Sequence, residues 1–235
     1  MPQKQFDEKL DELTRRLLDM SHRVEELVDG AVALAVREDG ADPEDVWEGD
    51  REIDQAEVAI EESCVELLAL HQPMATDLRQ IVTILKINND LERIGDHAVN
   101  IANAVDRLRR AGEFPPIPPE LEEMSRTSRG MLRDALDAFV HRSDEEAEAV
   151  MQRDDRVDQL HESVFRVMLT HMLDRNISAC LQVILISQNL ERIADLATNI
   201  GEDVVYLVRG TIRRHGGLEG EREAAEAEAE EPSDG

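Results

Sequence analysis

Apolar residues recur at intervals of three and four along most of the chain, which is the spacing of one face of an α-helix. Glycine, proline and other turn-forming residues interrupt this pattern at 40–43, 71–73, 112–119, 141–143 and 174–178. Between these places only helical periodicity appears. The pattern therefore predicts an all-α protein of six long helices.

Two of the predicted helices have a recognisable start. Asp42 directly precedes Pro43, which suits an N-cap followed by proline at the first helical position. Ser143 is followed three residues later by Glu146, which is the spacing of a capping box. We expect each pair to begin the second helix of a three-helix unit.

The two halves of the chain repeat each other. The sequence LERIGDHAVNI at 91–101 matches LERIADLATNI at 190–200. A pair of aspartates four residues apart lies upstream of each motif: Asp50 and Asp54, then Asp154 and Asp158. The prediction is two tandem three-helix bundles related by internal pseudo-twofold symmetry.

Breaks in composition give the domain limits. Residues 113–119 contain FPPIPP, which cannot continue a helix, so we expect a linker between a first bundle at 1–112 and a second at 120–214. Residues 215–235 lose all apolar periodicity and are rich in glutamate. We expect this C-terminal tail to be acidic and disordered.

The charge of the chain limits its partners. Its formal net charge is −27, so nucleic acids and anionic membrane surfaces would be repelled, and cations or basic protein surfaces are expected instead. Aromatic residues make up only 3%, which favours helices over sheet. No run of about 18 apolar residues occurs, and the first residues do not have the pattern of a signal peptide. We expect a cytoplasmic protein that does not insert into a membrane.

Each half carries two acidic pairs with four-residue spacing, which places like charges side by side on a helix and destabilises it slightly. Glu92 and Glu191 also interrupt a seven-residue series of largely apolar positions. A carboxylate on a packing face must be paired, hydrogen-bonded, protonated or metal-bound. Arg93 and Arg192 point about 100° away from these glutamates, so we do not expect them to compensate the charge.

The acidic pairs of one half converge if its second and third helices pack antiparallel. All-oxygen ligands suit Mg²⁺, Ca²⁺, Mn²⁺ or iron, and zinc stays among the candidates although no paired Cys or His indicates a structural zinc site. The alternative is that the acids only decorate a solvated surface, but their duplication in register favours a metal or another specific partner. The predicted metal ligands are Asp50, Asp54, Glu92, Asp96, Asp154, Asp158, Glu191 and Asp195.

The sequence does not point to catalysis. It has no Glu-x-x-His spacing in either motif, no glycine-rich phosphate loop, and no serine or cysteine beside a plausible histidine and acid. We therefore expect a metal-binding protein rather than an enzyme.

Across about residues 5–213 the chain resembles the PhoU family of phosphate-signalling proteins. The similarity lies in both acidic motifs, in the upstream GDREIDQAEVAIEESCVELL, and in the turn QPMATDLR at 72–79. The resemblance implies tandem three-helix bundles, often dimeric, in which Asp and Glu of the motifs bind metal clusters. One departure is Ala194, which stands where the first repeat has Gly95 and where the family usually has glycine. The second site thus departs from the family pattern beside its acidic motif, although no ligand is lost.

The resemblance further implies a negative regulator of phosphate uptake and of phosphate-starvation signalling. Such a regulator acts between the ATPase subunit of a phosphate ABC transporter and a phosphate-sensing histidine kinase, here as a homodimer. Two alternatives from other classes are a metal-dependent phosphohydrolase and a bundle that only buffers metal ions.

Overall fold

The computed structural model describes residues 2–36, 41–71, 73–112, 114–173 and 176–210. All regular structure in this part of the chain is helical, as predicted. The first bundle contains α1 (Pro2–Val36), α2 (Pro43–His71) and α3 (Ala75–Ala111). The second contains α4 (Pro119–His141), α5 (Asp144–Met151), α6 (Asp154–His171) and α7 (Ile177–Arg209). The predicted acidic tail at 215–235 lies outside the described residues.

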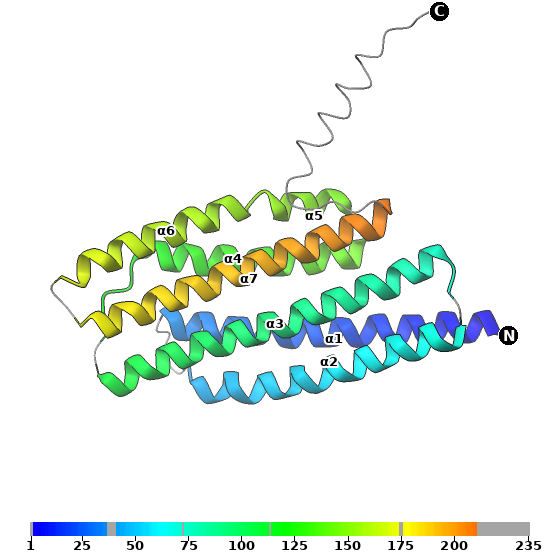
Figure 1. Ribbon diagram of the computed structural model, residues 1–235, viewed down its shortest axis with the longest axis horizontal. Coiled ribbons are helices and arrows are strands. Elements are labelled where there is room, and N and C mark those ends of the chain that lie inside the picture. The colour runs from blue at the N-terminus through cyan, green and yellow to red at the C-terminus, as the bar shows by residue number, and fades with distance from the viewer. Residues whose placement is uncertain (1, 37–40, 72, 113, 174–175, 211–235) are drawn as a thin grey trace, which may run out of the picture.

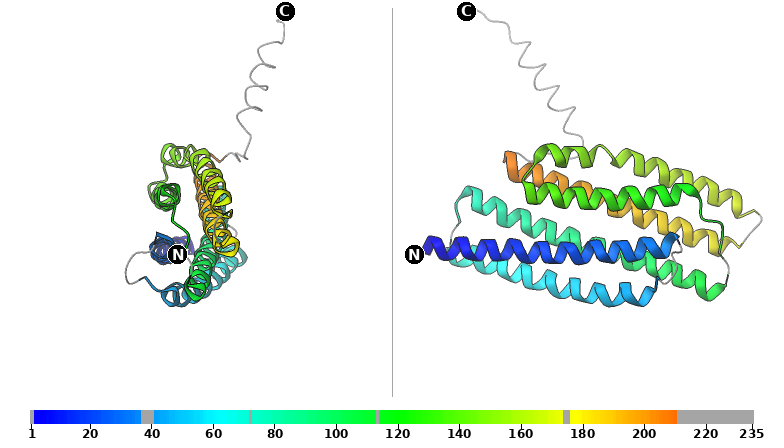
Figure 2. Two further views of the ribbon diagram at one scale, coloured as in Figure 1. Left: turned by 90° about the vertical axis from the view of Figure 1, so that its left-hand side faces the viewer. Right: turned by 180° about the vertical axis from the view of Figure 1, so that it is seen from behind.

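The two bundles lie side by side (Figure 1). Helices α3 and α7 form the main contact between them, and α1 and α4 form a smaller one (Figure 2). Each bundle has a core of buried leucine, isoleucine, valine and alanine side chains. The all-α tandem-bundle prediction is therefore confirmed.

The second helix of the second half differs from the expected single segment, because a turn at residues 152–153 divides it into α5 and α6. At this turn the backbone amide of Arg153 donates to the carbonyl of Val150 at 3.0 Å, and the amide of Arg156 donates to the carbonyl of Arg153 at 3.1 Å. Bonds between residues three apart tighten the chain relative to an α-helix. The Arg153 guanidinium also donates to Asp134 of α4 at 2.7 Å.

Both predicted helix starts are present. The Asp42 side chain accepts from the amide of Glu44 at 3.1 Å, and α2 begins at Pro43. The Ser143 hydroxyl accepts from the amide of Glu146 at 3.2 Å. The Glu146 carboxylate binds His141 at 2.9 Å. These bonds satisfy backbone donors that a helix start otherwise leaves open.

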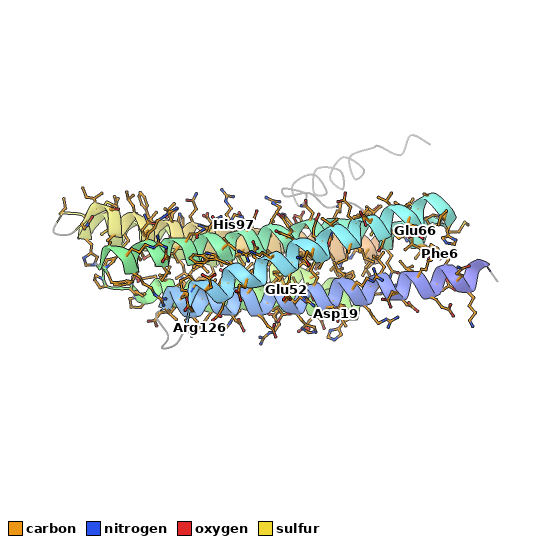
Figure 3. The ribbon with its side chains drawn as sticks, turned by 90° about the horizontal axis from the view of Figure 1, so that it is seen from below. Phe6, Asp19, Glu52, Glu66, His97 and Arg126 are labelled. Carbon is orange, nitrogen blue, oxygen red and sulfur yellow. The ribbon has the colours of Figure 1, made fainter. Side chains whose placement is uncertain are left out.

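Charged side chains link α1 and α2 at the surface of the first bundle. Glu52 and Glu66 of α2, both labelled in Figure 3, accept hydrogen bonds from Arg23 at 2.6 Å and from Lys9 at 2.7 Å on α1. These pairs are exposed, and each contributes at most about 1 kcal/mol. The apolar faces beneath them supply most of the stability.

Polar groups also lie within the contact between α3 and α7. His97 Nδ1 is 2.9 Å from Asn189 Oδ1, which joins the two halves. Nearby, the Lys86 ammonium donates to Asp203 and lies 5.5 Å from the centre of the Tyr206 ring.

Asp90 belongs to the same contact and is only 7% exposed. Burial, and then the like charge of Asp203, raise the pKa of Asp90 to about 6, although Arg93 and Lys86 oppose the shift. Burial also raises the pKa of Asp203, against the effect of Lys86. Ionised Asp90 therefore destabilises the folded state near neutral pH.

Replacing this carboxyl group should stabilise the protein. A folded-state pKa above the unfolded value means that the stabilisation from the protonated form is complete below about pH 4 and is lost as the pH rises through about 6. We expect Asp90→Asn to raise the free energy of unfolding by about 1 to 2 kcal/mol at pH 7.5 and by much less at pH 4.5. Urea unfolding at both pH values measures this. The exposed Asp137→Asn on α4 is the control, and equal effects of the two changes would contradict the prediction.

Candidate metal centres

The first acidic cluster lies where α2 and α3 pack against each other. Asp50 and Asp54 come from α2, and Glu92 and Asp96 come from α3. Asp50 and Glu92 are half-buried, whereas Asp54 and Asp96 are exposed. The two helices run antiparallel (Figure 1), and the carboxyl groups lie near enough for Asp54 and Asp96 to raise the pKa of Asp50.

A fifth carboxyl group, Glu57 of α2, joins this cluster. It is half-buried, and it lies near enough to Glu92 to help raise the pKa of that residue. The backbone carbonyl of Glu57 accepts a hydrogen bond from Asn88 Nδ2 of α3 at 3.1 Å, which holds the two helices in register. The sequence analysis missed this residue.

The first cluster is electrostatically unfavourable as it stands. Burial, followed by the charges of Asp54 and Asp96, raises the pKa of Asp50 to about 6. Burial and the neighbouring carboxylates, Asp96 first among them, also raise the pKa of Glu92. Within the described residues, none of the five carboxyl groups forms an ion pair with Lys, Arg or His. A bound cation would relieve this repulsion.

Gly95 allows Asp50 to approach α3 closely. A methyl group at this position would lie 3.1 Å from Asp50 Oδ1 and 3.6 Å from the Cδ1 atom of Ile53. The second repeat has Ala194 here, and this residue is fully buried. The aspartate that corresponds to Asp50 is Asp154, which begins α6 directly after the turn. The two clusters therefore differ in backbone geometry.

Of the acids predicted for the second cluster, Asp154 and Asp158 come from α6, and Glu191 and Asp195 come from α7. Burial, and then the charge of Asp195, raise the pKa of Asp158. Arg192 donates to Asp195 at 2.9 Å, so the expectation that this arginine would not compensate the acidic pair is wrong. Arg192 is three residues before Asp195, so the two side chains lie on the same side of α7, and the arginine side chain is long enough to reach the carboxylate. Arg93 instead pairs with Asp90, at 3.5 Å.

His161 of α6 is a further member of the second cluster that the sequence analysis missed. Its Nε2 atom lies 3.8 Å from Glu191 Oε2, and its Nδ1 atom lies 3.0 Å from the hydroxyl oxygen of Ser187. That hydroxyl donates its own hydrogen to the Ile184 carbonyl at 2.9 Å, so it accepts from Nδ1–H. In the neutral imidazole, Nε2 then carries the lone pair that could bind a metal, 3.8 Å from Glu191 Oε2. Orientation of one ring nitrogen by a hydrogen bond is typical of histidine metal ligands.

Alignment of the repeats contains the signal for both missed residues. Glu57 follows Asp54 by three positions, and His161 follows Asp158 by three. Each therefore occupies the equivalent place in its half, and each has a side chain that can bind a metal. Spacing of three on a helix places them beside their aspartates.

The donor groups fit a cation, although they are not arranged as a complete ligand set. Within the described residues, no three carboxylate, imidazole or thiol groups lie close enough together to hold one ion as they stand. The first cluster offers only oxygen, which suits a hard cation such as Mn²⁺, Mg²⁺ or Ca²⁺. The second offers oxygen together with an imidazole nitrogen, which suits Zn²⁺ or Fe²⁺ as well.

Comparison with known proteins places the chain in a family. The family described as PhoU domain matches residues 17–105 and 121–204, one stretch in each bundle. The chain belongs to the PhoU family. A relative from Pseudomonas putida, named a phosphate-specific transport system accessory protein PhoU homolog, is 43% identical over 91% of this chain and 84% of its own length. The PhoU protein of Escherichia coli K12 is 34% identical over 91% of this chain and 89% of its own.

Solved PhoU structures have the same fold. The crystal structure of PhoU from Pseudomonas aeruginosa has a TM-score of 0.84 at 39% identity and covers 88% of this chain and 100% of that one. The phosphate transport system regulatory protein PhoU from Streptococcus pneumoniae has a TM-score of 0.80 at 34% identity, covering 89% and 99%. The resemblance recognised in the sequence is confirmed. No described helix of this PhoU-family chain is long and apolar enough to cross a membrane.

Adding a methyl group at Gly95 should disturb the first cluster without unfolding the bundle. We expect Gly95→Ala to displace the Asp50 carboxylate and to weaken Mn²⁺ binding by roughly tenfold, the size of effect typical for groups that position a metal ligand. Its free energy of unfolding should change by less than about 1 kcal/mol, because alanine favours the helix. Calorimetric titration with Mn²⁺ measures the affinity.

Gly30→Ala is the matched control, because a methyl group there would make only an ordinary 3.4 Å contact with Val46. Equal Mn²⁺ affinity in both variants would show that Gly95 does not position Asp50 for the metal.

Proposed function

We propose that this protein is a negative regulator of phosphate uptake and of phosphate-starvation signalling. It acts as an adaptor that contacts the ATPase subunit of a phosphate ABC transporter and a phosphate-sensing histidine kinase, in the cytoplasm and as a homodimer. Membership of the PhoU family carries this proposal, since the relatives are named as accessory proteins of a phosphate-specific transport system. The strongly acidic chain favours basic surfaces on its partners.

The two acidic clusters are proposed to hold metal ions that support this role. Asp50, Asp54, Glu92 and Asp96 would bind the first ion or cluster of ions, with Glu57 as a further donor. A bound cation would offset the repulsion that raises the pKa of Asp50 and Glu92, and it would draw the packed helices together.

The second ion would be bound by Asp154, Asp158, Glu191 and Asp195, with His161 as a further donor. The hydrogen bond of His161 Nδ1 to Ser187 leaves Nε2, 3.8 Å from Glu191, as the nitrogen that would bind the metal. Arg192 forms an ion pair with Asp195, so a metal ion would compete with this guanidinium for the carboxylate. We therefore expect weaker binding of hard cations here than at the first cluster.

Deletion of the gene tests the regulatory role. We expect cells of the source organism without it to have high alkaline phosphatase activity in phosphate-rich medium, and the intact chain to restore repression. A chain with alanine at Glu92, Asp96, Glu191 and Asp195 should restore less repression if metal is required. Continued repression after deletion would count against the regulator, and metal-dependent phosphate release by the pure protein would favour a phosphohydrolase.

Exchange of the two unpredicted donors tests the metal assignment. We expect His161→Glu to weaken Zn²⁺ binding at the second cluster by about tenfold or more while Mn²⁺ binding changes little. Glu57→His at the first cluster should have the opposite effect and strengthen Zn²⁺ binding. Calorimetric titrations of the metal-free chain with each ion measure both changes. Identical Zn²⁺ affinities in the two variants and the original chain would exclude both residues as ligands.

A further inference from the structure

The second bundle exposes a group of large apolar side chains at the end where α6 turns into α7. Leu173 is 84% exposed, and Ile177 is 58% exposed. The group, here named the α6–α7 apolar patch, consists of Phe165, Leu169, Leu173, Ile177, Leu181 and Leu185. Large apolar side chains exposed together at one end of a folded protein are a candidate interaction site.

The residues of the patch form two stripes. Phe165 and Leu169 are four residues apart on α6, as are Leu181 and Leu185 on α7, so each pair lies on one side of its helix. Helices α6 and α7 lie side by side in Figures 1 and 2. His161, four residues before Phe165, contacts Ser187 of α7. The stripe on α6 therefore runs along the side of that helix that faces α7.

The patch has very little charge. Residues 177–190 of α7 contain no Asp, Glu, Lys or Arg, in a chain of which 34% is charged. On α6 the nearby Glu162 and Arg166 pair with each other at 2.7 Å and so neutralise one another. Exposure of these apolar side chains to water is unfavourable, so covering them with another apolar surface would lower the free energy.

Comparison of the repeats shows that the first bundle has part of this surface, since Val65 and Leu78 are exposed at the positions of Leu169 and Ile177, but two of its equivalent positions are charged. In the first bundle, Lys86 stands where the second has Leu185, and its ammonium group donates to Asp203. Glu61 stands where the second bundle has Phe165. Charge has thus been replaced by apolar surface at two places in the second repeat, while the acidic motifs are kept in both.

The acidic cluster of α6 and α7 adjoins the patch. Asp158 lies on the same stripe of α6 as Phe165, seven residues earlier, and it is close to Asp195 of α7. A ligand that lies along the hairpin therefore meets apolar side chains at one end and carboxylates at the other.

We propose that the α6–α7 apolar patch is a docking surface for an amphipathic helix of a protein partner. The apolar face of that helix covers the patch, and basic residues at one of its ends lie against Asp158 and the neighbouring acids. At this patch a second copy of this chain would bring the same acidic cluster against Asp158, and anionic lipids would meet the same repulsion, so a basic partner fits better than either. Docking at this patch requires neither bound metal nor the repressor role.

Binding of synthetic peptides by the full chain tests this inference. The probe is a fluorescent helical peptide of about 18 residues, with leucines at helical spacing along one face and a cluster of lysines at one end. One control has the same composition in scrambled order, and another has glutamate in place of every lysine. We expect the probe to bind at least about tenfold more tightly than either control.

Two variants of the chain locate the binding. Leu181→Ser should weaken binding of the probe by about tenfold, whereas Val140→Ser, an equally exposed position on α4, should leave it unchanged. Both changes are on the surface and should alter the free energy of unfolding by no more than about 0.5 kcal/mol. Thermal unfolding of each variant confirms that it is folded.

Several results would overturn the inference. Absence of probe binding, equal binding of the scrambled peptide, or equal affinity of Leu181→Ser and Val140→Ser would each do so. A concentration-dependent increase in mass that Leu181→Ser abolishes in sedimentation would show that a second copy covers the patch. Co-sedimentation with phosphatidylcholine and phosphatidylglycerol vesicles that Leu181→Ser abolishes would show that a membrane does.

Discussion

Helices α3 and α7 pack against the other helices of their own bundles and also against each other. An apolar arc wide enough for all these contacts leaves each helix few positions where a charge can reach water. Glu92 and Glu191 occupy such positions. Both are half-buried, so they lie at the margin of the buried face of their helices. The placement of the acidic clusters thus follows from the way the two halves are joined.

Carboxyl groups at such margins lose hydration and gain little from their neighbours. The pKa of Asp50 and Glu92 rises because burial and like charge act in the same direction. In the second cluster Arg192 reduces this imbalance by pairing with Asp195. Two sites of common descent have therefore acquired different electrostatics, which is a physical basis for different ligands in the two halves.

Much of the fold could be predicted from the sequence because the helix ends carry local signals. The Asp42 and Ser143 caps and the prolines at 115–119 each act within a few residues of the chain. The turn between α5 and α6 has no such local signal. The hydrogen bond of its Arg153 side chain goes to Asp134 of α4, which is 19 residues away in the sequence.

The candidate sites were only partly predictable for a related reason. Periodicity shows which side of a helix a residue occupies, but not the reach of a long side chain or the identity of the facing residue. The Arg192 contact with Asp195 therefore required three-dimensional coordinates. The place of His161 was available from the sequence once the repeats were aligned through Glu57.

The hydrogen bond between His97 of α3 and Asn189 of α7 joins residues next to the two acidic motifs. The pseudo-twofold symmetry does not repeat it. His97 adjoins Asp96 in the first motif, and Asn189 is two residues before Glu191 in the second. The symmetry-related positions hold Asp90 and Leu196, which cannot form the same bond because a leucine side chain has no donor. The two motifs are therefore joined asymmetrically, and each acidic cluster has a different neighbour across the contact between α3 and α7 despite the duplicated architecture.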